Sequence, residues 1–231
     1  MSVSRKGLFA KRGRRVAVLG AGLGLCALLA ACSPVQAGAA ATVGDQRITV
    51  SSLDTQVSNL QAAAKPYGSL PITTAEMPAA VLSWMIRFEI MDQVAAAHGI
   101  NVTEAQAQAA RDSLSTVATQ NGFKNTAELL IGNGVPPQMF EQVYRWEAQQ
   151  TAFELKQNGG KEPTTTTQQT ALTAAINKAQ CQAAKSLSIQ VSPQFGRMDY
   201  TQYAVVAAPD TLSRPAVSAS PASTQGLVPA C

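Results

Sequence analysis

The sequence has 231 residues, of which 18 are basic and 14 acidic, for a formal net charge of +4. Six of the 18 basic residues lie in the first 15 positions and all 14 acidic residues follow residue 32, so residues 32–231 carry a net charge of about −2. This balance excludes the basic surface expected of a nucleic-acid-binding protein. The length suits one domain with tails.

Residues 1–31 have the order of features that is typical of an export signal. Basic residues lie between Arg5 and Arg15, and an uncharged apolar stretch follows over residues 16–29. The stretch ends in LAAC at 29–32, which resembles the bacterial lipobox. We therefore predict a signal peptide over 1–31, lipidation of Cys32, and a lipoprotein held on the extracytoplasmic face of the cell membrane.

The same stretch could also be interpreted as a dinucleotide-binding turn, because it is rich in glycine. The G-x-G-x-x-G motif needs its third glycine for close packing of helix and strand. Gly20 and Gly22 match the first two positions, but Leu25 stands at the third. The stretch therefore does not indicate a nucleotide site, and we expect no cofactor.

Residues 32–41 are small and polar enough to form a tether, and we place the domain at 42–206. A turn at Gly44-Asp45 within the apolar alternation that follows predicts a short strand or a hairpin. Ser51 or Ser52 is expected to cap the first helix, which ends near Pro66.

The longest helix is predicted from about residue 75 to 97, with Thr74 as its cap and Pro78 in its first turn. Its apolar residues cover most of the circumference instead of one stripe. A helix of this kind is buried on several sides or lines a groove. We therefore expect it to form the centre of the fold.

Three further helices are predicted from their start and stop signals. A capping box at Thr103 to Gln106 begins one, which ends at Asn121-Gly122. A short helix is expected around 126–131. Pro136-Pro137 begins an amphipathic helix that ends at residues 158–160.

The remaining chain is predicted to contain a flexible link at 158–168, a helix from about 169 to 185 and a strand around Ile189. Residues 207–231 are rich in Ala, Pro, Ser and Thr, and we predict a disordered tail there. After export, two cysteines besides Cys32 remain. A disulfide between Cys181 and Cys231 would tie the tail to the domain.

The order of these parts resembles the N-terminal domain of the SurA and PrsA family of exported chaperones. The resemblance rests on three stretches within about 42–158: VGDQRITVSSLDTQV, AAAHGINVTEAQAQAA and NGFKNTAELLIGNGVPPQMFEQVYRWEAQQ. It implies a mainly α fold in which the N-terminal and C-terminal segments form a small hairpin or strand pair, with residues 169–192 as the returning segment. VSPQFGRMD resembles the ends of lipoproteins from high-GC Gram-positive bacteria, which implies an actinobacterial envelope.

The chain departs from this family at residues 158–168. SurA and PrsA carry parvulin-type prolyl isomerase modules at this place, whereas here there is only a threonine-rich link. A parvulin uses a pair of histidines, and His98 is the one histidine of the sequence. We therefore expect no isomerase activity.

Other enzyme activities also lack a sequence signal. Five carboxylates could form acid and base pairs, but they lie on predicted turns or exposed helix faces and show no motif spacing. They are Asp45, Asp54, Glu89, Asp92 and Glu104. The spacing of cysteine and histidine residues indicates no metal site. We therefore expect a non-enzymatic protein without a small-molecule substrate.

The resemblance implies a membrane-anchored, ATP-independent chaperone, or holdase, for unfolded or nascent exported polypeptides. Methionine and aromatic side chains suit such a surface because they adapt to different partners. The candidate client-binding residues are Trp84, Met85, Phe88, Met91, Met139, Phe140 and Trp146. Side chains of these types at helical spacing also commonly form a core. An alternative function is an envelope scaffold that binds one defined protein partner.

Overall fold

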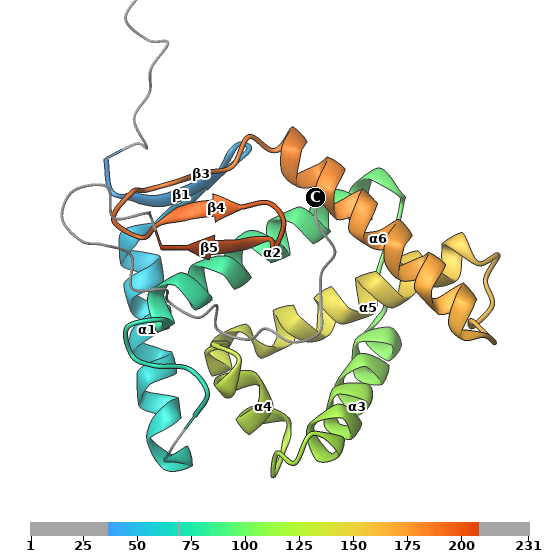
Figure 1. Ribbon diagram of the computed structural model, residues 1–231, viewed down its shortest axis with the longest axis horizontal. Helices are drawn as coiled ribbons and strands as arrows, with labels where there is room; N and C mark the ends of the chain where they lie inside the picture. Colours follow the sequence, from blue (N-terminus) through green and yellow to red (C-terminus); the bar gives the residue numbers. More distant parts are fainter. Residues whose placement is uncertain (1–36, 69, 208–231) are drawn as a thin grey trace, which may run out of the picture. The chain divides into compact units, whose positions relative to one another are not determined.

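The computed structural model describes residues 37–68 and 70–207. The predicted leader, Cys32, most of the tether and the tail from residue 208 onward lie outside these residues. The described part contains six α-helices and five short strands (Figure 1). The predicted mainly α fold is therefore confirmed.

The N-terminal and C-terminal segments meet in a three-stranded antiparallel sheet. β1 (Ala39–Val43) pairs with β2 (Gln46–Thr49) across the predicted turn, and its other edge pairs with β3 (Gln190–Val191). Both expected arrangements, the hairpin and the pair formed by the two ends of the domain, are thus present. The strand predicted around Ile189 is confined to two residues.

β1 begins inside the stretch that was predicted to be a tether. Ala39, Ala40 and Ala41 are at most 3% exposed. A run of alanine gives little sequence signal for a strand. Its small side chain, however, lets a strand lie close to the helices that cover it, here α1 and α2. The domain therefore starts at residue 39 or earlier instead of at 42.

α1 (Val50–Ala64) begins earlier than expected, because Thr49 is its N-cap and accepts a hydrogen bond from Ser52 N at 3.0 Å. A short 3₁₀ helix, η1 (Lys65–Tyr67), follows.

α2 (Met77–Ala97) has Pro78 in its first turn, as predicted. Its N-cap is Glu76, not Thr74. The Glu76 carboxylate accepts hydrogen bonds from the backbone and side chain of Thr73.

α2 lies at the centre of the described fold, where it contacts α1, α5, α6, β1 and β5. Its buried apolar side chains point to several sides; they include Val81, Leu82, Ile86, Ile90, Met91 and Val94. The prediction of a helix buried on several sides is confirmed. None of the described helices has the length and apolar character needed to cross a membrane.

α3 (Glu104–Gln120) begins with the predicted capping box, in which the side chains and backbones of Thr103 and Gln106 bond to each other. α4 (Thr126–Gly132) and the 3₁₀ turn η2 (Pro137–Met139) lead into α5 (Phe140–Gln157). α3 packs along α5. These boundaries agree with the start and stop signals of the sequence.

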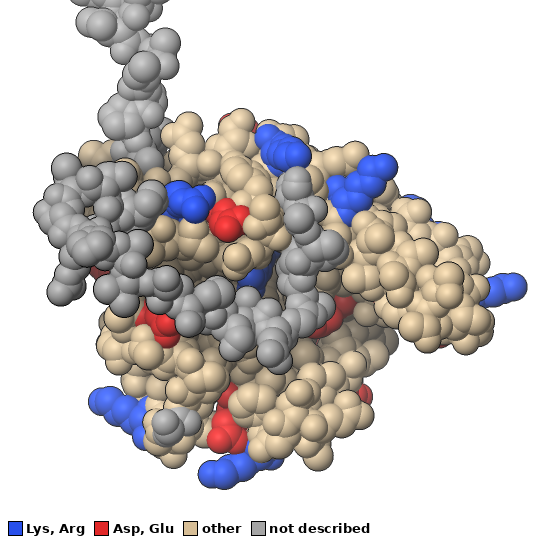
Figure 2. All heavy atoms as spheres, viewed as in Figure 1, with Lys and Arg blue, Asp and Glu red and all other residues tan. Residues whose placement is uncertain are grey.

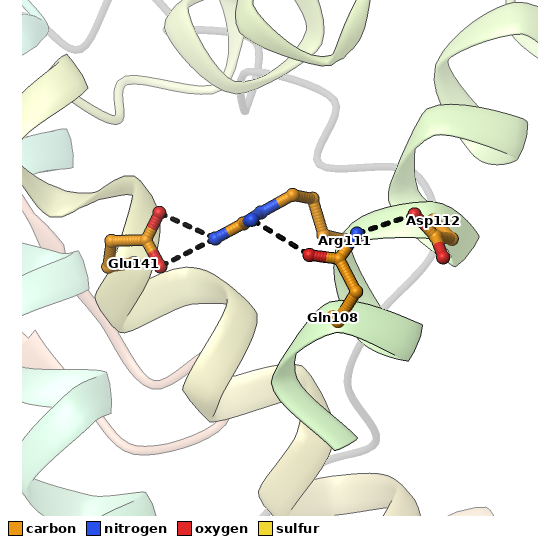
Figure 3. Close-up of polar contacts among 4 residues, drawn as sticks. All are labelled: Gln108, Arg111, Asp112 and Glu141. Carbon is orange, nitrogen blue, oxygen red and sulfur yellow. Dashed lines mark hydrogen bonds and ion pairs between the residues drawn. The ribbon is translucent and has the colours of Figure 1, made fainter. Parts of the chain in front are cut away.

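An ion pair connects α3 to α5 (Figure 3). Arg111 Nη2 lies 2.8 Å from both carboxylate oxygens of Glu141, while its Nη1 donates to Gln108 Oε1. The guanidinium also lies 4.9 Å from the centre of the Tyr144 ring. Arg111 therefore joins the two helices by charge and by stacking, which is a use of arginine that lysine does not reproduce.

α6 (Thr166–Ser186) begins inside the predicted link and packs against α2 and α5. A hairpin that the sequence did not predict follows, formed by β4 (Arg197–Asp199) and β5 (Ala204–Val206). β5 is attached to α2, because Val205 N donates to Ser83 Oγ and Arg87 Nε donates to Tyr203 O. Strands of three residues are too short to show a clear alternation.

On the face drawn in Figure 2, Lys and Arg side chains are interspersed with Asp and Glu side chains among uncharged ones. The described residues on this face therefore present mixed charge. This agrees with the small net charge of residues 32–231.

Candidate functional site

The structure divides the seven candidate client-binding residues into two groups. Met91 and Met139 lie in the core, at 0% and 3% exposure. Side chains so deeply buried support the fold and form no part of an accessible surface. The other five are half-buried and pack against the core with part of each side chain accessible; they are Trp84, Met85, Phe88, Phe140 and Trp146.

Three of these five, Met85, Phe88 and Trp146, line one groove between α2 and α5. We call it the α2–α5 groove; it has a volume of about 140 Å³. Its remaining lining residues are Glu89 and Asp92 of α2, Gln142, Arg145 and Gln149 of α5, and Ile48 of β2. The groove is thus apolar along one part and polar along another.

An aromatic cluster fixes the apolar part of the groove. The Trp84 ring lies 5.5 Å from that of Trp146 in an edge-on arrangement and 5.8 Å from that of Phe88. Trp84 is itself held by a hydrogen bond of 2.9 Å from its Nε1 to Asn133 O. Edge-on pairs of this kind add to the stability gained by burial. Trp84 therefore positions Phe88 and Trp146 and does not line the groove.

The polar part of the groove is organised around Asp92. Its Oδ1 accepts hydrogen bonds from Arg145 Nη2 at 2.8 Å and from Gln149 Nε2 at 2.7 Å. Gln149 is buried, whereas the side chains of Asp92 and Arg145 are 43% and 59% exposed. Since α2 supplies the acceptor and α5 both donors, these bonds also hold the two helices together.

Glu89 lies beside Asp92 and forms no hydrogen bond or ion pair with any described residue. Partial burial raises the pKa of its carboxyl, the charge of Asp92 raises it further, and Arg145 lowers it. A nearby cation stabilises the charged form of a carboxyl whose pKa is raised in this way. Glu89 is therefore the least satisfied charge of the groove.

A second hollow, of about 290 Å³, shares Glu89 and Asp92 with the α2–α5 groove. Its other lining residues are Val43, Asp45, Gln46, Gln93 and Leu187. The two hollows therefore meet at the two α2 carboxylates, and Asp45 adds a third carboxylate beyond them.

The sequence predicts an exposed helix face for Glu89 and Asp92, whereas in the structure both are half-buried in the groove. Arg145 and Gln149 are not predicted as site residues from the sequence. The available signal was the position of these two residues beside Trp146 on an amphipathic helix. Pairing them with α2 requires knowledge of which helix faces meet.

Among residues 37–68 and 70–207, no group of His, Cys, Asp and Glu side chains is suited to hold a metal ion. Cys181 is half-buried on α6, and its predicted partner Cys231 lies outside the described residues, as does Cys32. The disulfide and the lipidation therefore stay predictions.

Comparison with known proteins identifies the family. Residues 21–152 match the family described as SurA-like N-terminal domain, and the match includes α1 to α4 and most of α5. The sequence matches no curated protein and no solved structure. Because the family match covers more than half of the 231 residues, the protein belongs to the SurA-like N-terminal domain family, a chaperone-type family.

Proposed function

We propose that the protein is a membrane-anchored, ATP-independent holdase that binds unfolded exported polypeptides in the α2–α5 groove, without prolyl isomerase activity. The observation that carries this proposal is the groove itself. Within a domain of a chaperone-type family, it presents the half-buried side chains of Met85, Phe88 and Trp146. These lie beside polar side chains that have unused hydrogen-bond acceptors.

The dimensions of the groove favour a polypeptide over a small molecule. Its volume of about 140 Å³ is smaller than the roughly 300–1,000 Å³ typical of small-molecule pockets. A single apolar side chain of a client can be buried there, which stabilises the complex by about 1.5–3 kcal/mol. Contacts of this strength allow binding and release without ATP.

The environment of His98 supports the absence of isomerase activity. The His98 ring packs edge-on against Phe153, with 4.9 Å between ring centres. It does not line the groove. A histidine pair of the parvulin type cannot form from the one histidine of the sequence.

Membrane anchoring is proposed from the lipobox that ends at Cys32. A Cys32→Ala variant is expected to lose incorporation of labelled fatty acid and to leave the membrane fraction, because the lipid is the anchor. Metabolic labelling and fractionation measure both effects. A variant that stays uncleaved and membrane-bound would show that the leader itself is the anchor.

Holdase activity is tested with the chain from residue 33 onward, which contains every described residue. The purified protein is expected to delay the aggregation of a chemically unfolded client, followed by light scattering. Phe88→Ala removes an aromatic ring from the groove and should weaken this effect several-fold. Phe140→Ala is the matched control, since it removes a half-buried aromatic ring outside the groove lining.

Circular dichroism checks that both variants stay folded. The proposal fails if the parent protein neither delays aggregation nor binds the client. Crosslinking in cells separates it from the scaffold alternative: a range of exported proteins supports the holdase, whereas one dominant partner supports a scaffold.

A further inference from the structure

Acidic side chains outnumber basic ones in the α2–α5 groove and the adjoining hollow. Three carboxylates line it and the adjoining hollow, namely Asp45, Glu89 and Asp92. Arg145 is the one basic side chain among these lining residues, and it is already paired with Asp92. The electrostatic potential at the meeting point of the two hollows is therefore negative.

Unused hydrogen-bond acceptors lie at the same place. Both bonds to Asp92 end on Oδ1, so Oδ2 has no partner among the described residues. Glu89 has none on either carboxylate oxygen in the described part of the chain. Carboxylate oxygens form their strongest hydrogen bonds with ammonium and guanidinium groups.

The spacing of the apolar and acidic parts suits an extended polypeptide. Along α2, Met85 and Phe88 each precede a carboxylate of the groove, Glu89 and Asp92, by four residues. Four residues of helix rise by about 6 Å. In an extended chain, side chains on the same side are two residues apart and separated by about 6.6 Å. An apolar residue and a basic residue at i and i+2 would therefore reach the two parts together.

We propose that the groove prefers unfolded segments in which a Lys or Arg lies two residues from a bulky apolar residue, with the apolar side chain against Met85, Phe88 and Trp146 and the cation against Glu89 and Asp92. This specificity rests on the holdase function proposed above. It identifies the class of client within that function.

The test uses three labelled unfolded peptides that differ at one position, which is Lys, Gln or Glu two residues after a leucine. Binding to the chain from residue 33 onward is measured by fluorescence anisotropy at low salt. The Lys peptide is expected to bind at least five-fold more tightly than the Glu peptide, with Gln between them. The difference should shrink in 0.5 M NaCl, since salt screens charges that solvent reaches.

Glu89→Gln keeps the size of the side chain and removes its charge, so it should reduce the preference for Lys over Glu several-fold. Glu104→Gln is the matched control, because Glu104 is an exposed carboxylate of α3 outside the groove lining. Equal binding of the three peptides, or a preference that Glu89→Gln leaves unchanged, overturns the inference while the holdase function stands. Failure of every peptide to bind also overturns the inference, and it overturns the holdase function only where the protein likewise fails to delay client aggregation.

Discussion

Glu147 on α5 is a carboxyl group inside the described fold whose pKa is strongly raised. Burial raises its pKa to about 7, and the charge of Glu154 contributes in the same direction. No described residue forms an ion pair or a hydrogen bond with its side chain. Glu147 is therefore a residue that opposes folding when it is charged.

The sign of this effect follows from proton binding. Between about pH 4.5 and 7 the folded protein binds more protons at Glu147 than the unfolded chain does, so the free energy of unfolding falls as the pH rises through this window. Glu147→Gln should remove this loss. We expect it to stabilise the protein by about 1–3 kcal/mol at pH 8 and little at pH 4.5.

Urea unfolding at the two pH values measures this difference. Glu162→Gln, at an exposed position before α6, should change the stability by less than about 0.5 kcal/mol at either pH. Equal effects of Glu147→Gln at pH 4.5 and pH 8 would contradict the explanation, because a change in packing alone does not depend on pH.

Arg87 is also a charged residue inside the fold, but unlike Glu147 it has hydrogen-bond partners. Burial lowers its pKa to about 10, so it stays charged at neutral pH. Its donors reach the carbonyl oxygens of Gln202 and Tyr203, and its guanidinium lies 5.1 Å from the centre of the Trp84 ring. Arg87 therefore connects the β4–β5 hairpin to the aromatic cluster behind the groove.

At the scale of elements, the turn between α4 and η2 packs closely against α2. Gly134 has a φ of +80°, and a Cβ placed there would lie 2.6 Å from Ala80 Cβ. The preceding residue, Asn133, supplies the carbonyl oxygen that holds Trp84. Because Gly134 has no side chain, the turn can lie against α2 and place the Asn133 carbonyl oxygen beside Trp84.

Gly134→Ala should lower the free energy of unfolding by about 2–4 kcal/mol, because it combines the cost of a left-handed backbone with a clash against α2. Gly122→Ala is the matched control: its φ is +78°, but a Cβ there meets no atom within 4 Å. It should cost only about 1 kcal/mol.

Chemical denaturation gives both values, and tryptophan fluorescence reports whether Trp84 changes its environment. Equal losses for the two variants would show that the close approach to Ala80 contributes nothing.

At the scale of the whole molecule, residues beyond the family match complete the fold. The match ends at residue 152, within α5, whereas α6 packs on α2 and α5, β3 pairs with β1, and β5 attaches to α2. These segments cover sides of α2 that would otherwise expose apolar surface. The described domain is therefore closed by its last 50 or so residues.

The charge of the groove predicts a pH dependence of client binding. Glu89 faces Asp92 on α2, Arg145 on α5 and Asp45 in the β1–β2 turn, and its pKa is raised. A bound Lys side chain favours the charged form and so lowers this pKa. Affinity for the Lys peptide should thus fall as the pH decreases through the pKa of Glu89, more than affinity for the Gln peptide. Anisotropy titrations between pH 7.5 and 5 measure this, and parallel curves for the two peptides would contradict it.

Local features of the fold could be predicted from the sequence because they depend on residues close together in the chain. The capping box at Thr103, the stop at Asn121-Gly122 and the all-round apolar pattern of α2 are of this kind. Errors arose where the observed cap is not a residue type typical of that position, as for Glu76 before α2, or where small residues carried little signal, as in β1. The lipobox is likewise a local pattern, and its consequences stay predictions.

The sequence by itself determined that the protein is a mainly helical member of its family, because helix periodicity, caps and family motifs are written in short stretches of chain. Only the tertiary structure decided that Met91 and Met139 are core while Met85, Phe88 and Trp146 line a groove. The physical reason is that α2 is apolar nearly all round. Which of its sides stays accessible depends on how α5, α6 and the hairpin pack against it, and such contacts join residues 53 and 122 positions apart.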